Sequence, residues 1–405
     1  MKKIARIICL VLACLFCLLT VVACDPSDNG GKNGGNATVK TDKDGVRWAA
    51  DEWGVWREYD NLPDDLDYEE DEIVILSRYR EGWTSGEIAV KELLSEPVND
   101  AVYERNKAVE ERLDVEIEVI QEETPIDKVV TAVSSGNTDY DVMVELCWRA
   151  APKFTGNYFY NLRNTEYLDF EKPWWNQSFT DVVTYNDITF GVTGAMVLSL
   201  YRRTYVTVFN KDLFKNANQT YLYDYVENGT WTLDKQASLV PLFHQDNGNS
   251  QQDKAGDIYG FVSNDFICVD PYWASCEVEI IRKSADGDYE WVFEPAKLHD
   301  MAEKVLKLYY GNGDAAYIEH DDVQSENTVL SVFSGGYAAM GTLCIQLLEN
   351  ALMRNMEQEY GVVPIPKYSE DQKNYSAYLG YTIPILFLAS NVPDPERNGT
   401  IMEAL

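Results

Sequence analysis

The chain has 405 residues, 67 acidic and 34 basic side chains, and a formal net charge of −33 at pH 7. Nucleic acid is a poor partner for it, because binding a phosphate backbone needs basic clusters. The charge favours solubility and carries no direct information about a ligand. The length is enough for two lobes of ordinary size.

The N-terminus has the pattern of a secretion signal. Lys2, Lys3 and Arg6 precede the apolar run 7–22, which is too short and wrongly flanked for a comfortable membrane span. The order Val-Val-Ala before Cys24 resembles the lipobox of bacterial lipoproteins, in which the thiol receives a diacylglyceryl group. The resemblance implies removal of residues 1–23 and a palmitate-type lipid anchor on the outer face of the cell membrane. A plain signal peptide with a chance cysteine is the alternative.

The segment after Cys24 predicts a tether. Residues 25–45 are rich in Gly, Asn, Asp and Lys, and such a composition cannot bury enough apolar surface to offset its ordering entropy. Trp48, Trp53 and Trp56 follow among acidic residues, where they could dock on the folded body or on cell-wall material. A poorly ordered approach segment is the simpler interpretation. We therefore predict a lipidated flexible linker over residues 24–71.

From residue 72 the pattern predicts alternating strands and helices. Strands are expected at 72–77, 115–120 and 140–144, with helices at 99–113 and 127–133 between them. This βαβαβ order predicts a parallel sheet with helices on its faces. Ligands of such sheets bind beyond the carboxyl ends of the strands.

That rule selects the residues that follow the strands. Arg78, Tyr79 and Trp83 follow the first strand, and Glu145 and Trp148 follow the third. The alternative for the two tryptophans is that they cover the edge of the sheet. A nucleotide is disfavoured here, because the first strand is not followed by a glycine-rich phosphate loop.

Later segments carry weaker signals. Strands are predicted at 188–193 and 205–209, and a helix is predicted to start within 231–235. The polar loop 245–257 contains three aspartates, but their spacing does not fit an EF-hand, so a solvated turn is favoured over a calcium site. Pro173-Trp174-Trp175 could be a stacking platform or a structural corner.

The cysteines and histidines give no metal or catalytic pattern. The spacing of Cys147, Cys268, Cys276 and Cys344 matches no zinc site, and Cys268 with Cys276 could at most close one local disulfide. Isolated thiols are the favoured interpretation. The three histidines lie far apart in sequence. We predict no metal, no cofactor and no catalytic residue.

Several segments occur in the order of landmarks known from one family. They are 162–175, then 188–194 with 208–214, then 231–234 with 259–261, then 333–340, and last 360–367. In this order they resemble the extracellular solute-binding proteins of ABC importers, the family that includes maltose-binding and other sugar-binding lipoproteins.

The resemblance implies an α/β, two-lobe periplasmic-binding-protein-like fold of type II. We place lobe 1 at 72–195 and 337–381, and lobe 2 at 203–336 and 382–405. The first crossing is expected within 195–203, the return near 333–340 and a second outward crossing near 381–384. Family members continue into further C-terminal helices, so we expect the second lobe to be incomplete.

The resemblance further implies capture of a carbohydrate, most simply an oligosaccharide, by a monomer that delivers it to a permease without chemistry. The expected ligand contacts are Arg78, Tyr79, Trp83, Glu145, Trp148, Tyr272, Trp273, Gly341 and Thr342. Two alternatives stay open at this point: a secreted glycoside hydrolase, since acidic residues are abundant, and a surface scaffold or adhesin without a transport role.

Overall fold

The computed structural model describes residues 39–50, 54–80, 87–137, 139–249, 251–320, 325–379 and 382–405. The chain divides into two compact units, Met1–Asp64 and Asp65–Leu405. The predictions for the signal segment, for Cys24, for Trp53 and for Trp83 lie outside the described residues.

The first unit contains a small antiparallel sheet of β1 (Val39–Thr41), β2 (Arg47–Ala50) and β3 (Trp56–Glu58). The Lys40 ammonium lies 4.6 Å from the centre of the Trp56 ring, and Arg47 Nη2 lies 2.6 Å from Asp64 Oδ1. The prediction of a flexible linker is therefore wrong for 39–50 and 54–64. Composition did not show that basic, aromatic and acidic side chains pair across short strands.

The second unit begins with a four-stranded sheet in the order β14-β6-β4-β5. Its strands are β4 (Asp71–Arg78), β5 (Val115–Glu122), β6 (Val142–Leu146) and β14 (Pro384–Phe387). β4 runs parallel to β5 and β6, and β14 runs antiparallel to β6. The connections contain α2 (Pro97–Leu113) and α3 (Pro125–Ser135), so the βαβαβ prediction is confirmed. The third strand begins two residues later than predicted.

Both connecting helices have clear sequence boundaries. Each has a proline in its first turn, where the missing N–H is no loss. α3 ends at Gly136, whose φ of +74° suits a residue without a side chain. The remaining helices packed with this sheet are α4 (Cys147–Ala150), α5 (Gln177–Val183), α6 (Ser199–Arg202), α14 (Pro395–Ala404) and the 3₁₀ turns η1 (Ala151–Gly156) and η2 (Leu162–Asn164). We call this sheet and its helices the first lobe.

The predicted strand 188–193 is wrong. This segment makes only isolated bridges, between Tyr185 and Ile188 and between Val192 and Leu386. Val192 is nevertheless fully buried in the core of the first lobe. The apolar pattern therefore indicated correctly that the segment is buried, but it did not indicate whether the segment pairs continuously with a neighbouring strand.

A second, five-stranded sheet has the order β11-β8-β12-β7-β13. Its strands are β7 (Tyr205–Asn210), β8 (Phe261–Asn264), β11 (Ala316–Glu319), β12 (Met340–Cys344) and β13 (Tyr360–Pro364). β7 confirms the strand predicted at 205–209. α9 (Leu233–Leu239) confirms the helix predicted from 231–235, and the Thr232 side chain caps it by accepting from the backbone N–H of Lys235.

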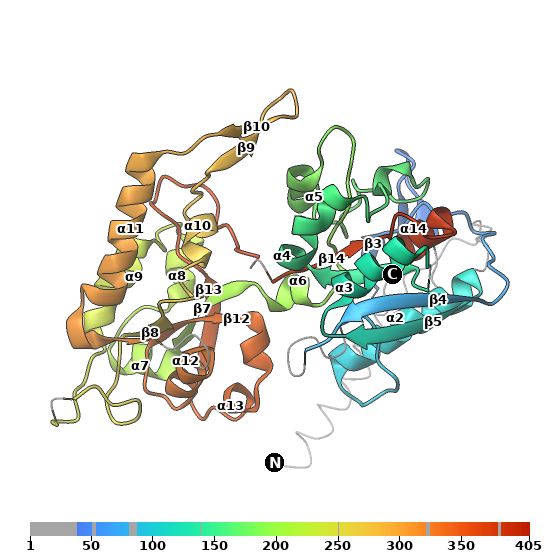
Figure 1. Cartoon of the computed structure of the whole chain (residues 1–405). Helices are drawn as coiled ribbons and strands as arrows, with labels where there is room; N and C mark the ends of the chain where they lie inside the picture. Colours follow the sequence, from blue (N-terminus) through green and yellow to red (C-terminus); the bar gives the residue numbers. More distant parts are fainter. Residues whose placement is uncertain are drawn as a thin grey trace, which may run out of the picture. The chain divides into compact units, whose positions relative to one another are not determined.

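This sheet and its helices form the second lobe, which can be followed in Figure 1. The other helices are α7 (Lys211–Asn216), α8 (Leu222–Glu227), α10 (Pro271–Ser275), α11 (Pro295–Tyr310), α12 (Ser325–Ser334) and α13 (Ala351–Arg354). Short 3₁₀ turns are η3 (Val240–Leu242), η4 (Gly313–Ala315) and η5 (Ile345–Glu349). β9 (Ile281–Lys283) and β10 (Tyr289–Trp291) form an antiparallel hairpin.

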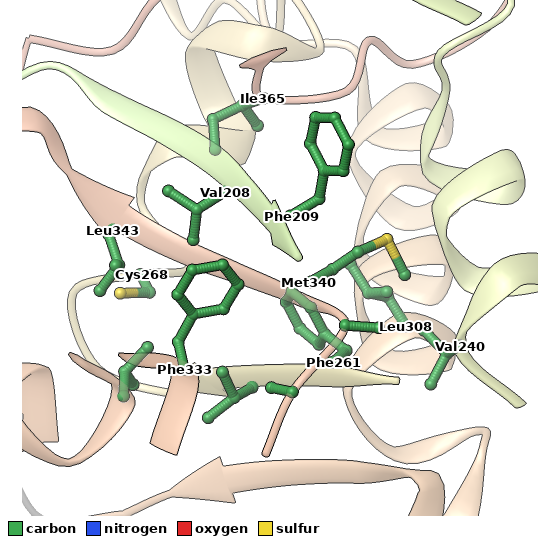
Figure 2. Close-up of a cluster of buried hydrophobic side chains, with 14 of the residues drawn as sticks. Val208, Phe209, Val240, Phe261, Cys268, Leu308, Phe333, Met340, Leu343 and Ile365 are labelled. Atoms are coloured by element: carbon green, nitrogen blue, oxygen red, sulfur yellow. The ribbon is translucent and has the colours of Figure 1, made fainter. Parts of the chain in front are cut away.

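The two sheets have separate hydrophobic cores. Figure 2 shows part of the second core, where side chains from β7, β8 and β12 meet those of α11 and α12; the labelled members include Val208, Phe209, Phe261, Leu308, Phe333, Met340 and Leu343. All of these side chains are fully buried. Each lobe therefore has the packed interior that an independent α/β layer structure needs.

The predicted division of the C-terminal half between the lobes is wrong. β12 and β13, within the range 337–381 assigned to lobe 1, pair with β7 of the second sheet. β14 and α14, within the range 382–405 assigned to lobe 2, belong to the first lobe, where Leu386, Ile401 and Met402 are buried. The chain thus stays in the second lobe beyond 333–340 and returns to the first near 384. The apolar pattern of a strand is compatible with either sheet, and only the strand with which it pairs determines the lobe to which it belongs.

Several further expectations concern single side chains. Cys268, Cys276 and Cys344 are buried and free, and Cys147 is half-buried and free. In the polar loop, Asp257 accepts from the backbone N–H groups of Asn247 and Asp253, which fits a hydrogen-bonded turn. Among the described residues, no helix combines the length and apolar character that crossing a bilayer requires.

The C-terminal helix is fastened to the first lobe by a buried carboxylate. Glu403 Oε2 accepts from Trp175 Nε1 at 2.8 Å and from the backbone N–H of Asp169 at 3.3 Å. Trp175 is buried against Phe170, so Pro173-Trp174-Trp175 forms a structural corner at Trp175. Burial raises the pKa of Glu403 to about 7, against the opposing effect of the hydrogen bond from Trp175.

This raised pKa predicts a pH-dependent stability. Between about pH 4.5 and 7 the unfolded chain releases the proton that the folded chain keeps, so the free energy of unfolding falls as the pH rises. Glu403→Gln keeps an acceptor for Trp175 without the charge. We expect equal stability near pH 5 and a variant more stable near pH 8 by on the order of 3 kcal/mol. Urea unfolding at both pH values measures this.

The exposed Glu171→Gln is the matched control, and it should leave the difference between the two pH values unchanged. A Glu403→Gln variant with the same pH dependence as the wild type would contradict the assignment.

Candidate ligand-binding site

The carboxyl edge of the first sheet brings together residues that are far apart in sequence. Arg78 is the last residue of β4 and Glu145 is the penultimate residue of β6. The two strands are parallel neighbours, with Ser77 paired to Val144. Arg78 Nε therefore lies 3.9 Å from Glu145 Oε1. The edge expected to hold the ligand carries this pair of charged side chains.

Glu145 is the buried member of this pair, and backbone N–H groups hold its carboxylate in place. It is 0% exposed, and its two oxygens accept from the backbone N–H groups of Leu146 at 2.7 Å and Ile126 at 3.3 Å. Burial raises its pKa, while these hydrogen bonds and the nearby Arg78 oppose the shift. The expected direct ligand contact by Glu145 does not fit this burial. Its carboxylate is placed to orient Arg78.

Trp148 is the exposed aromatic group at this edge. It lies in α4, immediately after β6, and is 47% exposed. The guanidinium carbon of Arg149 lies 4.7 Å from the centre of its ring, a distance typical of a cation–π contact. An aromatic face held this way can stack on the apolar C–H face of a sugar ring.

Tyr79 and Trp83 complete the predicted contacts of the first lobe. The backbone N–H of Tyr79 donates to the carbonyl of Glu122 at 2.7 Å, which extends the β4–β5 pairing by one residue. The Tyr79 side chain is half-buried. Trp83 lies outside the described residues, so its role stays a prediction.

The corresponding edge of the second sheet carries a polar cluster that we did not predict. β8 and β11 are parallel neighbours, and Asp265 and His320 directly follow them. Asp265 Oδ2 lies 2.6 Å from His320 Nδ1 and accepts from the Tyr310 hydroxyl at 3.0 Å. The next residue, Phe266, is exposed. Together these side chains offer hydrogen-bonding groups beside an aromatic face.

Four predicted contacts fall in the second lobe, and three of them are wrong. Tyr272 is buried against Tyr309 in the core. Gly341 and Thr342 lie inside β12 and are fully buried; a Cβ on Gly341 would come within 3.1 Å of Val262. Trp273 is partly exposed and remains a candidate.

Arg149, Asp265 and His320 were therefore missed, although a usable signal existed. Asp265 and His320 directly follow β8 and β11, and Arg149 lies in α4, the short helix that directly follows β6. Extending the rule by one residue in α4 would have included Arg149. Applying it to β8 and β11 required knowing that those short strands exist and are parallel.

A pocket of about 420 Å³ lies at the base of the β9–β10 hairpin. It is lined mainly by charged side chains, among them Glu277, Glu279, Arg282, Glu294 and Lys297. Arg282 is already paired with Glu279. The lining residues of the pocket include no aromatic side chain, so we do not place the ligand there.

Metal ligands do not gather in the described parts of the chain: no group of three His, Cys, Asp or Glu side chains there could hold an ion. The polar groups at the two sheet edges are instead arranged as hydrogen-bond donors and acceptors beside aromatic faces. This is the usual composition of a site that binds a polar organic molecule.

Comparison with solved structures gives the fold. The GacH receptor of Streptomyces glaucescens, described unliganded and with acarbose, matches with a TM-score of 0.52 at 14% identity, over 83% of this chain and 75% of that chain. A cyclo/maltodextrin-binding protein complexed with maltotetraose matches with a TM-score of 0.52 at 13% identity, over 84% of this chain and 75% of that chain. The fold is that of the two-lobe solute-binding proteins.

The likeness to these solute-binding proteins is one of architecture. No family model matches the chain, and no curated protein matches it in sequence. The solved structures confirm the two-lobe α/β fold that was expected from the sequence landmarks. The two-lobe fold also explains why exposed aromatic and polar groups appear at the carboxyl edges of both sheets.

Trp148 gives a direct test of the site. Because its ring is exposed, Trp148→Ala should leave the melting temperature of the free protein nearly unchanged. It should weaken binding of the oligosaccharide that the wild type binds by about tenfold or more, which corresponds to a loss of about 1.4 kcal/mol. Isothermal titration calorimetry and thermal unfolding measure the two effects.

Trp291→Ala is the matched control, since Trp291 is 77% exposed and lies on the β9–β10 hairpin. It should bind like the wild type. If Trp148→Ala instead lowers the melting temperature at unchanged affinity, Trp148 is a packing residue and the site assignment is wrong.

Proposed function

We propose that this protein is the extracellular substrate-binding component of an ABC importer and that it captures a carbohydrate, most simply an oligosaccharide. The observation that carries the proposal is the solute-binding fold with an exposed tryptophan and two arginine side chains at the expected edge of the first sheet. The two neighbours named above are described with acarbose and with maltotetraose.

The mechanism is capture and release without chemistry. A sugar stacks its C–H face on Trp148, and its hydroxyl groups replace the water around polar groups such as Arg78 and Arg149. Phe266, Trp273 and the Asp265–His320 pair supply a second set of contacts. A ligand that touches both lobes favours the closed arrangement, which the permease then recognises.

The N-terminal sequence pattern supports a proposed location for the protein. We propose that residues 1–23 are removed and that Cys24 carries a lipid, which holds the protein as a monomer on the outer face of the cell membrane. There it can pass its cargo to the permease subunits. A tethered binder needs no further membrane contact of its own.

A glycoside hydrolase and a surface scaffold or adhesin are not favoured by any observation in the described structure. Glu145, a buried carboxylate at the first-lobe edge, is occupied by two backbone N–H groups. It is therefore poorly placed to protonate a glycosidic oxygen.

The proposal is tested by titrating the purified protein with a panel of neutral and acidic oligosaccharides and recovering each ligand afterwards. We expect saturable binding of at least one oligosaccharide and its recovery unaltered by chromatography. Product formation beyond one equivalent would instead identify an enzyme. Failure of every saccharide to bind would overturn the carbohydrate assignment.

The lipid anchor gives a separate prediction. In a bacterial host, the wild-type chain should fractionate with membranes and incorporate labelled palmitate. Cys24→Ser removes the acceptor thiol, so the label should be lost and the protein should leave the membrane fraction. Cys147→Ser is the matched control, because Cys147 lies in the folded first lobe. Label retained by Cys24→Ser would contradict lipidation at this residue.

A further inference from the structure

The first-lobe edge carries clustered positive charge although the chain as a whole is acidic. The chain has a net charge of −33, yet the charges of both Arg78 and Arg149 act on the buried Glu145. Burial lowers the pKa of Arg78; the charges of Glu145 and Glu123 oppose this shift, while those of Arg149 and Arg80 add to it. Three basic and two acidic side chains, counting Arg78 itself, therefore lie within electrostatic range of Arg78.

Glu145 is a single carboxylate beside the two guanidinium groups of Arg78 and Arg149, so it balances only part of their charge. Its two oxygens are engaged by the backbone N–H groups of Leu146 and Ile126. Its distance of 3.9 Å from Arg78 Nε is longer than a hydrogen bond. Positive charge is left over at the edge of the sheet.

Two donors of the cluster are left without an acceptor. Within the described chain, Arg78 Nη1 and Arg149 Nε are buried from solvent and have no hydrogen-bond partner. The Arg78 side chain as a whole is only 11% exposed. A buried donor without a partner costs about 1–3 kcal/mol, and more when it is charged. Such donors are typical of a site whose missing acceptor arrives with the ligand.

We propose that Arg78 and Arg149 bind an anionic oxygen group of the ligand, so that the saccharide captured is an acidic one carrying a carboxylate or a sulfate. This inference rests on the proposed function. A neutral hydroxyl accepts a hydrogen bond but leaves the surplus charge in place. An anionic group offers several oxygens to planar guanidinium groups and balances their charge as well.

The position of Trp148 fits such a ligand. Arg149 is its neighbour in α4 and lies against one face of its ring. A pyranose ring stacked on the exposed Trp148 brings its ring substituents to the same edge as the two arginines. Stacking then supplies affinity for a sugar, and the arginines supply the preference for an acidic one.

The test compares matched sugars that differ only in the acidic group. The purified protein is titrated calorimetrically with digalacturonate against galactobiose, dimannuronate against mannobiose, and 6-sulfated galactobiose as the sulfate arm. We expect at least one acidic sugar to bind about tenfold or more tightly than its neutral partner. The arm that binds identifies carboxylate or sulfate as the source.

Two variants link this preference to the cluster. Arg149→Gln and Arg78→Gln keep an amide donor but remove the charge, so the ratio of acidic to neutral affinity should fall towards one. Arg149→Lys should restore part of it. Arg282→Gln is the control, since Arg282 is exposed on the hairpin. Thermal unfolding checks that each variant is folded. If Arg78→Gln unfolds because Glu145 is buried beside it, the affinity ratio of the Arg149→Gln variant still tests the proposal, since Arg149 is half-buried.

The outcomes are separable from those of the proposed function. Equal affinity for acidic and neutral sugars, or a preference that both arginine variants keep, overturns this inference and leaves the carbohydrate-binding function standing. If neither acidic nor neutral saccharides bind, the proposed function itself fails, and this inference fails with it.

Discussion

The parallel pairing of β4 with β6 is the constraint on which the candidate site depends. It brings the last residue of one strand beside the penultimate residue of the other, so Arg78 meets Glu145 although 66 positions of sequence lie between them. The buried carboxylate is held by backbone N–H groups from β6 and from the start of α3. This fixed negative charge keeps the Arg78 guanidinium group at the edge of the sheet.

The same lobe is completed by the last part of the chain. β14 adds an antiparallel edge strand to β6, and α14 buries Ile401 and Met402 in the core built mainly from residues before 202. Glu403 then ties this helix to Trp175. The lobe that carries Arg78 and Trp148 is therefore stabilised by contacts that form only after the second lobe has been synthesised. This arrangement couples the rigidity of the site to the return of the chain from the second lobe.

The sequence was most informative where local pattern and tertiary structure agree. The alternation of apolar strands with amphipathic helices predicted β4, α2, β5, α3 and β6 with small errors at their ends. The sequence pattern failed where the position of a residue depended on which strand or side chain packs against it. Gly341 and Thr342 were expected to contact the ligand, yet they lie inside β12 between β7 and β8. Tyr272 was expected to contact the ligand, but it packs in the core beside Tyr309. Small and aromatic residues occur both in cores and in binding sites, so residue type alone does not separate the two.

The sequence by itself determined the order of the first strands and helices, the solute-binding type of fold through its landmarks, and the positions of Arg78 and Trp148 at strand ends. These depend on periodicity and on neighbours in the chain, which the sequence contains directly. Only the tertiary structure decided that β12 and β13 belong to the second sheet, that β14 and α14 return to the first, and that the charges of Arg78 and Arg149 both act on the buried Glu145. These facts are set by which strand pairs with which, and strands of similar apolar character do not carry that choice in their own residues.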